Sequence, residues 1–368
     1  MSNASLDGKS ISIEDAYRRA AQILAGAKFP LIAGLGADVA GARAAILLAE
    51  RLRGAYDHLA SGDSLADIDT IRSFGMFTTT PNEARVRADV VLLIGPGLAG
   101  HWPGLFERLA LDKPPRHGAN AGKPRKIVWL GPKRGEGKID GGEVKTIAAA
   151  PHEISGVLAA WRARLGGRPV ALEPAKVKAT DALVSTLKEA RFGVAVWAAG
   201  AGLDALAVEM LQGLVTELNA TTRFTGVPLG ARSGAAGVNQ TSGWMTGFPP
   251  RTGFGRGYPE HDPWRFEAGR LVESGEAAAA LWISAYDGEP PPWGEADIPT
   301  ITLAPAGAAP ERGLYIEVGR PGRDHDAVEF APEAGGLALR PAAAPSLRPS
   351  VASVIAAIGA KFPEDSPC

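Results

Sequence analysis

Residues 29–36 read FPLIAGLG, an apolar run that ends in glycines and leads into a helical pattern over 38–53. Two more segments repeat this design, DVVLLIGPG at 89–97 and GVAVWAAGAG at 193–202, and a helical pattern follows each. Buried parallel strands are continuous apolar runs, and a parallel pair needs a crossover connection that is usually a helix. The sequence therefore predicts an α/β protein with mostly parallel sheets and helices on both faces.

The rest of the chain contains further elements of the same kinds, separated by segments rich in proline and glycine. Strands are expected at 126–130, 144–148, 278–284, 299–303 and 313–318, and helices at 13–26, 102–110, 151–165, 180–190, 204–218, 261–274 and 350–361. Residues 166–178 are expected to be a linker, and residues 341–349 (PAAAPSLRP) a tether to the last helix.

Residues 230–265 show neither a helical nor a strand period. Unstructured loops longer than about 12–15 residues are usually binding loops or lids. This segment is rich in Trp, Phe, Tyr and Arg, the residue types enriched at interface anchors. The expected contacts to a partner or ligand are Trp244, Arg251, Arg256, Tyr258 and His261.

Two turns share the spacing Gly-x-Gly-x-Asp between a strand and a helix. They consist of Gly34, Gly36 and Asp38, and of Gly200, Gly202 and Asp204. A glycine turn before a helix can hold a phosphate, but a nucleotide fingerprint has a third glycine where neither turn has one. An aspartate at a helix start caps the same backbone donors that a phosphate would use. The spacing favours the capping interpretation, and no Walker-type Gly-Lys-Ser/Thr motif occurs.

Composition and charge exclude several classes of protein. The 368 residues carry 39 Lys and Arg against 40 Asp and Glu, so no broad cationic field draws nucleic acid or an anionic membrane. Apolar runs are far shorter than the roughly 20 residues that span a bilayer, and the N-terminus lacks an apolar signal core. We therefore expect a soluble cytoplasmic protein that binds neither nucleic acid nor membrane.

No complete catalytic motif is present in the sequence. Because the one cysteine is Cys368, an internal disulfide, a cysteine-ligated iron–sulfur cluster and a structural cysteine zinc site are all excluded. None of the six histidines shows a metal-binding spacing. His101 follows the end of an expected strand and His261 lies in the segment 230–265, so these two could contact a ligand. The Gly-x-Ser-x-Gly elbow of α/β-hydrolases is missing as well.

Several segments together resemble the B subunit of formylmethanofuran dehydrogenase. They are residues 43–57, residues 78–95 with His101 and Pro103 just after, residues 237–266 with Asn239, Trp244, Phe254, Arg256 and Pro263, and residues 276–287. The resemblance covers about 29–340. That family belongs to the molybdopterin-type oxidoreductases. Its working members are expected to hold tungsten or molybdenum on two pterin guanine dinucleotides, with a cysteine ligand, a neighbouring histidine and a four-cysteine iron–sulfur site.

This chain departs from the family at each cysteine. Residues 59–64 read LASGDS where the family places Cys-His-Gly, and Gly131 stands where an acidic nucleotide reader is expected. The resemblance then implies a degenerate form that has lost molybdopterin, tungsten and the iron–sulfur cluster and has no cofactor. It is similar to the beta subunit of the formyltransferase/hydrolase complex of methylotrophic bacteria.

That similarity implies a non-catalytic architectural subunit in one-carbon metabolism. The complex transfers formyl from formyl-tetrahydromethanopterin to a methanofuran-type carrier and releases formate during formaldehyde oxidation. The implied partners are an alpha hydrolase, a formyltransferase and a gamma-like subunit in a hetero-oligomer. Arg251, Arg256, Tyr258 and His261 could hold the acidic tail of the carrier, or the arginines could pair with a neighbouring subunit.

The same resemblance implies that one α/β domain is inserted into another. Residues 1–57 with 192–340 would form a discontinuous domain, residues 58–191 the inserted domain, and residues 341–368 a C-terminal tether and helix. Periodicity alone equally allows two sequential domains.

The sequence is compatible with two other functions. The first is an active molybdopterin oxidoreductase of the formylmethanofuran dehydrogenase type with Ser61, Asp63 or Ser64 as its metal ligand, because some relatives in that superfamily use serine or aspartate. The second is an α/β protein that binds a nucleotide at the Gly34/Gly36 or Gly200/Gly202 turn.

Overall fold

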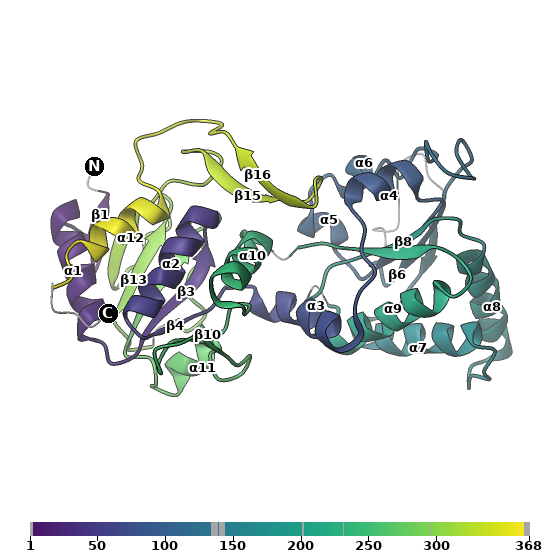
Figure 1. Ribbon diagram of the computed structural model, residues 1–368, viewed down its shortest axis with the longest axis horizontal. Helices are drawn as coiled ribbons and strands as arrows, with labels where there is room; N and C mark the ends of the chain where they lie inside the picture. Colours follow the sequence, from purple (N-terminus) through teal and green to yellow (C-terminus); the bar gives the residue numbers. More distant parts are fainter. Residues whose placement is uncertain are drawn as a thin grey trace. The chain divides into compact units, whose positions relative to one another are not determined.

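The computed structural model describes residues 3–133, 139, 144–200, 202–230, 232–294 and 296–363 (Figure 1). The chain forms two compact units. The first unit consists of Met1–Ser61, Arg232–Phe330 and Leu337–Cys368, and the second of Gly62–Ala231 and Ala331–Gly336. One unit is therefore continuous apart from six residues, and it interrupts the other.

The first unit is built on a nine-stranded sheet of order β11-β10-β4-β3-β12-β13-β14-β1-β2. The strands are β1 (Ala4–Leu6), β2 (Lys9–Ser10), β3 (Pro30–Gly36), β4 (Ala55–Tyr56), β10 (Thr252–Gly253), β11 (Glu260–His261), β12 (Ala279–Ser284), β13 (Thr300–Ala304) and β14 (Leu314–Glu317). The central strands from β4 to β14 run parallel, and short antiparallel strands complete both edges. A separate hairpin pairs β15 (Ala327–Ala331) with β16 (Gly336–Arg340).

Helices cover both faces of this sheet because its central strands are apolar on both sides. On one face α1 (Ile13–Gly26), α2 (Val39–Arg51), α10 (Ala235–Thr246) and α12 (Val351–Gly359) pack together over Ile32, Leu281 and Ile283 (Figure 1). The other face, with Leu31, Ala33 and Trp282, is covered by α11 (Ala268–Glu273).

The second unit is a five-stranded, fully parallel sheet of order β7-β6-β5-β8-β9. Its strands are β5 (Val90–Ile94), β6 (Lys126–Leu130), β7 (Val144–Ile147), β8 (Gly193–Trp197) and β9 (Phe224–Pro228). Its helices are α3 (Ser61–Phe74), α4 (Pro81–Arg87), α5 (Leu98–His101), α6 (Leu105–Arg108), α7 (Ile154–Leu165, after a 3₁₀ turn at Pro151–Glu153), α8 (Pro174–Lys188) and α9 (Ala205–Leu218).

The side chains of this sheet form a separate core on each face. Val90, Leu92 and Ile94 point to the face covered by α7, α8 and α9. Val91 and Leu93 point to the face covered by α4, α5 and α6. The predicted α/β architecture, with parallel strands and helices on both faces, is confirmed.

The boundaries of the inserted unit differ from those expected. Residues 192–231 belong to the second unit because β8 pairs with β5 in full register and β9 pairs with β8. The expected boundary at 191 is therefore too early by about one strand–helix–strand segment. The sequence suggests that residues 341–368 form a tether and helix apart from both domains, but α12 packs on α1 and α2 within the first unit.

Three helix predictions are also wrong in extent. The helix expected at 180–190 begins at Pro174, where proline suits the first helical position, so the end of the expected linker, residues 174–178, is helical. Of the helix expected at 102–110, only α6 (Leu105–Arg108) forms, and it begins after Gly104, whose φ of +74° lies in the left-handed region. Of the helix expected at 261–274, only Ala268–Glu273 forms.

The segment 230–265, expected to lack regular structure, contains the twelve-residue helix α10 and strands β10 and β11. The α10 sequence AAGVNQTSGWMT has low intrinsic helix propensity because of its glycines and hydroxyl residues. The helix packs on α2, and the Thr241 hydroxyl donates to the Gly237 carbonyl at 2.8 Å. Tertiary packing thus outweighs local propensity here.

No helix within the described part of the chain is long and apolar enough to cross a lipid bilayer.

Candidate functional site

Asp57 lies at the carboxyl end of the parallel sheet of the first unit. It follows β4, whose residues pair with β3 on one side and with β10 on the other. Only 3% of Asp57 is exposed, and its Oδ2 accepts a hydrogen bond of 3.0 Å from the Ala268 amide at the start of α11. Burial raises the pKa of Asp57 from 3.8 to about 6, although the charge of Arg251 and the Ser61 hydroxyl act in the opposite direction.

Arg251 approaches Asp57 from the segment between α10 and β10. Its Nε lies 3.6 Å from Asp57 Oδ2, too far for a normal hydrogen bond, while its Nη1 donates to the Pro263 carbonyl at 2.7 Å. The backbone of Arg251 adopts a left-handed φ of +66°, which is unusual for a residue other than glycine. The Arg251 amide donates to the Tyr56 carbonyl at 3.1 Å, which ties this strained residue to the end of β4.

His58 is buried beside Asp57, and both of its ring nitrogens have partners. Nδ1 accepts from the Ala60 amide at 2.9 Å, so the ring proton is on Nε2, which donates to the Ser233 carbonyl at 3.1 Å. Burial lowers the pKa of His58 from 6.5 to about 4. The imidazole is therefore neutral near pH 7 and serves as a hydrogen-bonding strut between two loops.

These residues border a small cavity of about 130 Å³. Its lining comprises Gly34, Asp57, His58, Leu59, Arg232, Arg251, Glu267, Ala268, Trp282, Glu289, Pro290 and Pro292. Arg232 forms an ion pair with Glu289, and Glu267 caps α11 by accepting from the amides of Gly269 and Arg270. Most of the charge around the cavity is thus balanced by neighbours in the same unit.

The five residues expected to contact a partner do not gather into one pocket. Arg251 is mostly buried, whereas Trp244 at the end of α10 is 66% exposed and Tyr258 in the β10–β11 connection is 53% exposed. Arg256, also in that connection, pairs with Glu260 at 3.3 Å. His261 stacks on Phe248, and the Nδ1 of His261 lies 3.0 Å from the Arg251 carbonyl oxygen.

The structure adds residues that the sequence pattern does not indicate. Trp264 has a largely exposed side chain, at 71%, and the Arg270 guanidinium lies 4.6 Å from its ring centroid. The sequence pattern does not indicate Asp57 and His58 as site residues, because the preceding strand β4 is only two residues long and gives no strand signal. His101, the other histidine considered for ligand binding, lies in the second unit at the end of α5.

The two glycine turns are occupied by structural contacts. Asp38 caps α2 through the Gly41 amide at 2.9 Å, and Asp204 caps α9 through the Ala207 amide at 2.8 Å. A Cβ at Gly34 would stand 2.4 Å from the Ile283 carbonyl oxygen, and one at Gly200 would stand 1.8 Å from Asp63 Oδ1. The glycines thus permit close packing, in agreement with the capping interpretation.

The residues considered as alternative metal ligands lie at the start of α3. Ser61 Oγ accepts from the His58 amide at 3.1 Å, and the Asp63 side chain lies against Gly200. Ser64 lies in the first turn of the helix. Among the described residues, no group of three or more His, Cys, Asp or Glu side chains is placed to hold a metal ion.

Comparisons with known proteins show that this α/β chain is similar to B subunits of formylmethanofuran dehydrogenase. No protein-family model matches the sequence. Two curated relatives are B subunits of tungsten-containing formylmethanofuran dehydrogenase 2. The relative from Methanococcus maripaludis is 26% identical over 292 residues, covering 77% of this chain and 66% of the relative. The relative from Methanocaldococcus jannaschii is also 26% identical, over 298 residues.

A further relative covers nearly the whole chain. The B subunit of the formyltransferase/hydrolase complex Fhc of Methylorubrum extorquens is 31% identical over 365 residues, which cover 95% of this chain and 94% of the relative. A chain in the crystal structure of the FhcABCD complex from that organism, determined with methylofuran, superimposes with a TM-score of 0.86 at 32% identity over 96% of this chain and 97% of that chain. The chain belongs to the family of formyltransferase/hydrolase complex B subunits.

Proposed function

We propose that this protein is a non-catalytic architectural subunit of a formyltransferase/hydrolase complex. The complex would transfer formyl from formyl-tetrahydromethanopterin to a methanofuran-type carrier and release formate in formaldehyde oxidation. The observation that carries this proposal is the similarity to an Fhc B subunit over almost the full length of both chains. The crystallised relative is part of the FhcABCD assembly with methylofuran.

The proposed partners are the alpha hydrolase, the formyltransferase and a gamma-like subunit. Exposed tryptophan, tyrosine and arginine side chains are typical anchors of protein interfaces. Trp244, Tyr258, Trp264 and Arg256 of the first unit have this character and are our candidates for partner contact. Arg256 would also support a second role for these side chains, contact with the acidic part of a methanofuran-type carrier.

We further propose that the chain has lost the metal–pterin group of its dehydrogenase relatives. The residues at the carboxyl end of the first sheet do not fit such a group. Both ring nitrogens of His58 are engaged by backbone groups, and Asp57 accepts from the start of α11. The cavity beside them, at about 130 Å³, is below the roughly 300–1,000 Å³ of typical small-molecule pockets.

The deciding experiment is elemental analysis for tungsten and molybdenum on the native assembly, purified through a tag on this chain. We expect neither metal in an assembly that still releases formate. Near-stoichiometric metal would overturn the proposal in favour of an oxidoreductase, and Ser61→Ala and Asp63→Ala variants would then identify the ligand. Full formate release by the remaining subunits after deletion of this chain would contradict the architectural role.

We propose the cytoplasm as the location of the protein, since the proposed function makes it a subunit of a formyltransferase/hydrolase complex of one-carbon metabolism. Fractionation of cells that express the tagged chain tests it. Recovery of the assembly with periplasmic or membrane fractions would be the contrary result.

A further inference from the structure

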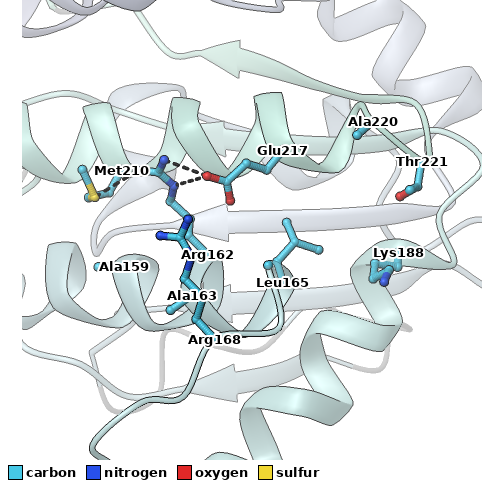
Figure 2. A pocket seen from close by; sticks show the side chains of 11 residues that line it. Ala159, Arg162, Ala163, Leu165, Arg168, Lys188, Met210, Glu217, Ala220 and Thr221 are labelled. Atoms are coloured by element: carbon cyan, nitrogen blue, oxygen red, sulfur yellow. Dashed lines mark hydrogen bonds and ion pairs between the residues drawn. The ribbon is translucent and has the colours of Figure 1, made fainter.

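A second, larger hollow lies in the second unit, between α7 and α9. It has a volume of about 630 Å³. Its lining comprises Ala159, Arg162, Ala163, Leu165, Gly166, Arg168, Lys188, Met210, Glu217, Ala220 and Thr221, and Figure 2 shows these side chains. Most residues that line this groove have small or apolar side chains, and the cations Arg162, Arg168 and Lys188 border it.

Arg162 forms the middle of the groove and is already neutralised. Its Nε and Nη2 donate to Glu217 Oε1 at 3.0 and 2.8 Å, and its Nη1 lies 3.3 Å from the Met210 sulfur (Figure 2). Gly213 makes this arrangement possible, because a Cβ there would stand 2.4 Å from the Arg162 guanidinium carbon. The pair thus bridges α7 and α9 and leaves its charge balanced.

The other two cations of the groove, Arg168 and Lys188, have no carboxylate partner in the described part of the chain. Two acidic side chains of the α8 segment are already paired with other cations: Asp181 with Arg164 at 2.7 Å, and Glu189 with Lys126 at 2.7 Å. With Arg162 and Glu217 cancelling each other, the groove has two uncompensated positive charges.

We infer that this groove is a docking site for an acidic segment of a partner polypeptide. Alanine and glycine along the wall let a backbone approach closely, and Leu165 and Met210 offer apolar contact. Carboxylates of the segment would pair with Arg168 and Lys188, which are exposed and free to reorient. A small inorganic anion would find only single, separate cations here and few converging donors. The inference rests on the proposed role as a subunit of an assembly.

Site-specific photo-crosslinking in the assembled complex tests the occupant directly. Benzoylphenylalanine is placed at Ala159, in the groove, and at Lys176 on α8 as an exposed control outside it. We expect the Ala159 probe to crosslink to a peptide of another subunit that contains at least two Asp or Glu residues, and the control to give no such product. A crosslink to a peptide without acidic residues or to a second copy of this chain, or no crosslink, would overturn the inference.

A charge-reversal pair measures the contribution of the two cations. Arg168→Glu with Lys188→Glu should weaken recovery of that subunit at least about tenfold at low salt, with a smaller difference at high salt because exposed charges are screened. Lys176→Glu with Lys178→Glu makes the same change in net charge outside the groove and should have little effect. Equal recovery for both variants in an intact complex overturns this inference alone. If the wild-type chain recovers no subunits at all, the proposed function itself is wrong.

Discussion

The buried carboxyl group of Asp57 gives the sharpest prediction about the site. Its pKa rises from 3.8 to about 6 in the folded protein because burial disfavours the charged form more than Arg251 favours it. A group with a raised folded pKa contributes stability that is fully present below the unfolded pKa and is lost as pH rises through the folded pKa. The free energy of unfolding should therefore fall between about pH 4 and pH 7 on account of this residue.

The size of the effect follows from the two pKa values. A shift from 3.8 to about 6 corresponds to about 3 kcal/mol over the full titration. Between pH 8 and pH 5, the partial titration amounts to about 1.4 kcal/mol by the linkage relation. Asp57→Asn removes the ionisable group but keeps an oxygen that can accept from the Ala268 amide. The variant should thus gain about 1.4 kcal/mol relative to wild type as pH rises from 5 to 8.

Urea unfolding of both proteins at pH 5, 6, 7 and 8 measures this difference. Comparison at each pH cancels the contribution of other titrating groups, including His58, whose lowered pKa acts with the opposite sign. Amide exchange in β3 and β4 is a second readout, specific to the first unit. A difference that stays constant within about 0.4 kcal/mol would refute the reasoning. A reversed slope would mean that Arg251 dominates and holds the carboxylate charged.

Three further outcomes are expected. Gly34→Ala should lower the free energy of unfolding by at least about 2 kcal/mol, because its Cβ would clash with the Ile283 carbonyl oxygen. Gly75→Ala, which is also at positive φ but in open space, should lower it by only about 1 kcal/mol. Thermal or urea unfolding measures both losses, and equal losses would argue against close packing at Gly34. Trp264→Ala should change stability of the chain by less than about 0.5 kcal/mol yet reduce recovery of partner subunits, with exposed Leu347→Ala as the control; unchanged recovery would remove Trp264 from the interface. NAD, FMN and ATP should not raise the melting temperature of the protein. A true ligand at 100 times its Kd would stabilise the fold by about 2.7 kcal/mol. A clear rise in melting temperature with any of the three would restore the nucleotide-binding alternative.

The three central strands of the second unit, β5, β6 and β8, are predictable because they are apolar runs. The strand expected at 126–130 forms β6 with these bounds, and residues 193–202 contain β8. Helix α1 likewise begins and ends where expected, at Ile13 and Gly26. Local pattern is sufficient for such elements because burial on both faces and helix capping act within a few residues.

The candidate site is much harder to predict because its parts come from distant segments. Asp57, Arg251 and the start of α11 meet only after β10 has paired with β4. The sequence favours Arg251 as a contact to a partner or carrier, and it gives no sign that this side chain is mostly buried beside Asp57 on a backbone with a positive φ. The helical state of α10 likewise depends on packing against α2 rather than on its own residues.

The sequence by itself determined the α/β class, most of the parallel strands, several of the helices, and the capping function of Asp38 and Asp204. These depend on apolar periodicity and on hydrogen bonds between near neighbours. Only the tertiary structure decided which sheet β8 and β9 join, where the inserted unit ends, and which charges remain unpaired on the surface. Strand pairing and ion pairs join residues that are far apart in the chain, so their free energies have no local signature in the sequence.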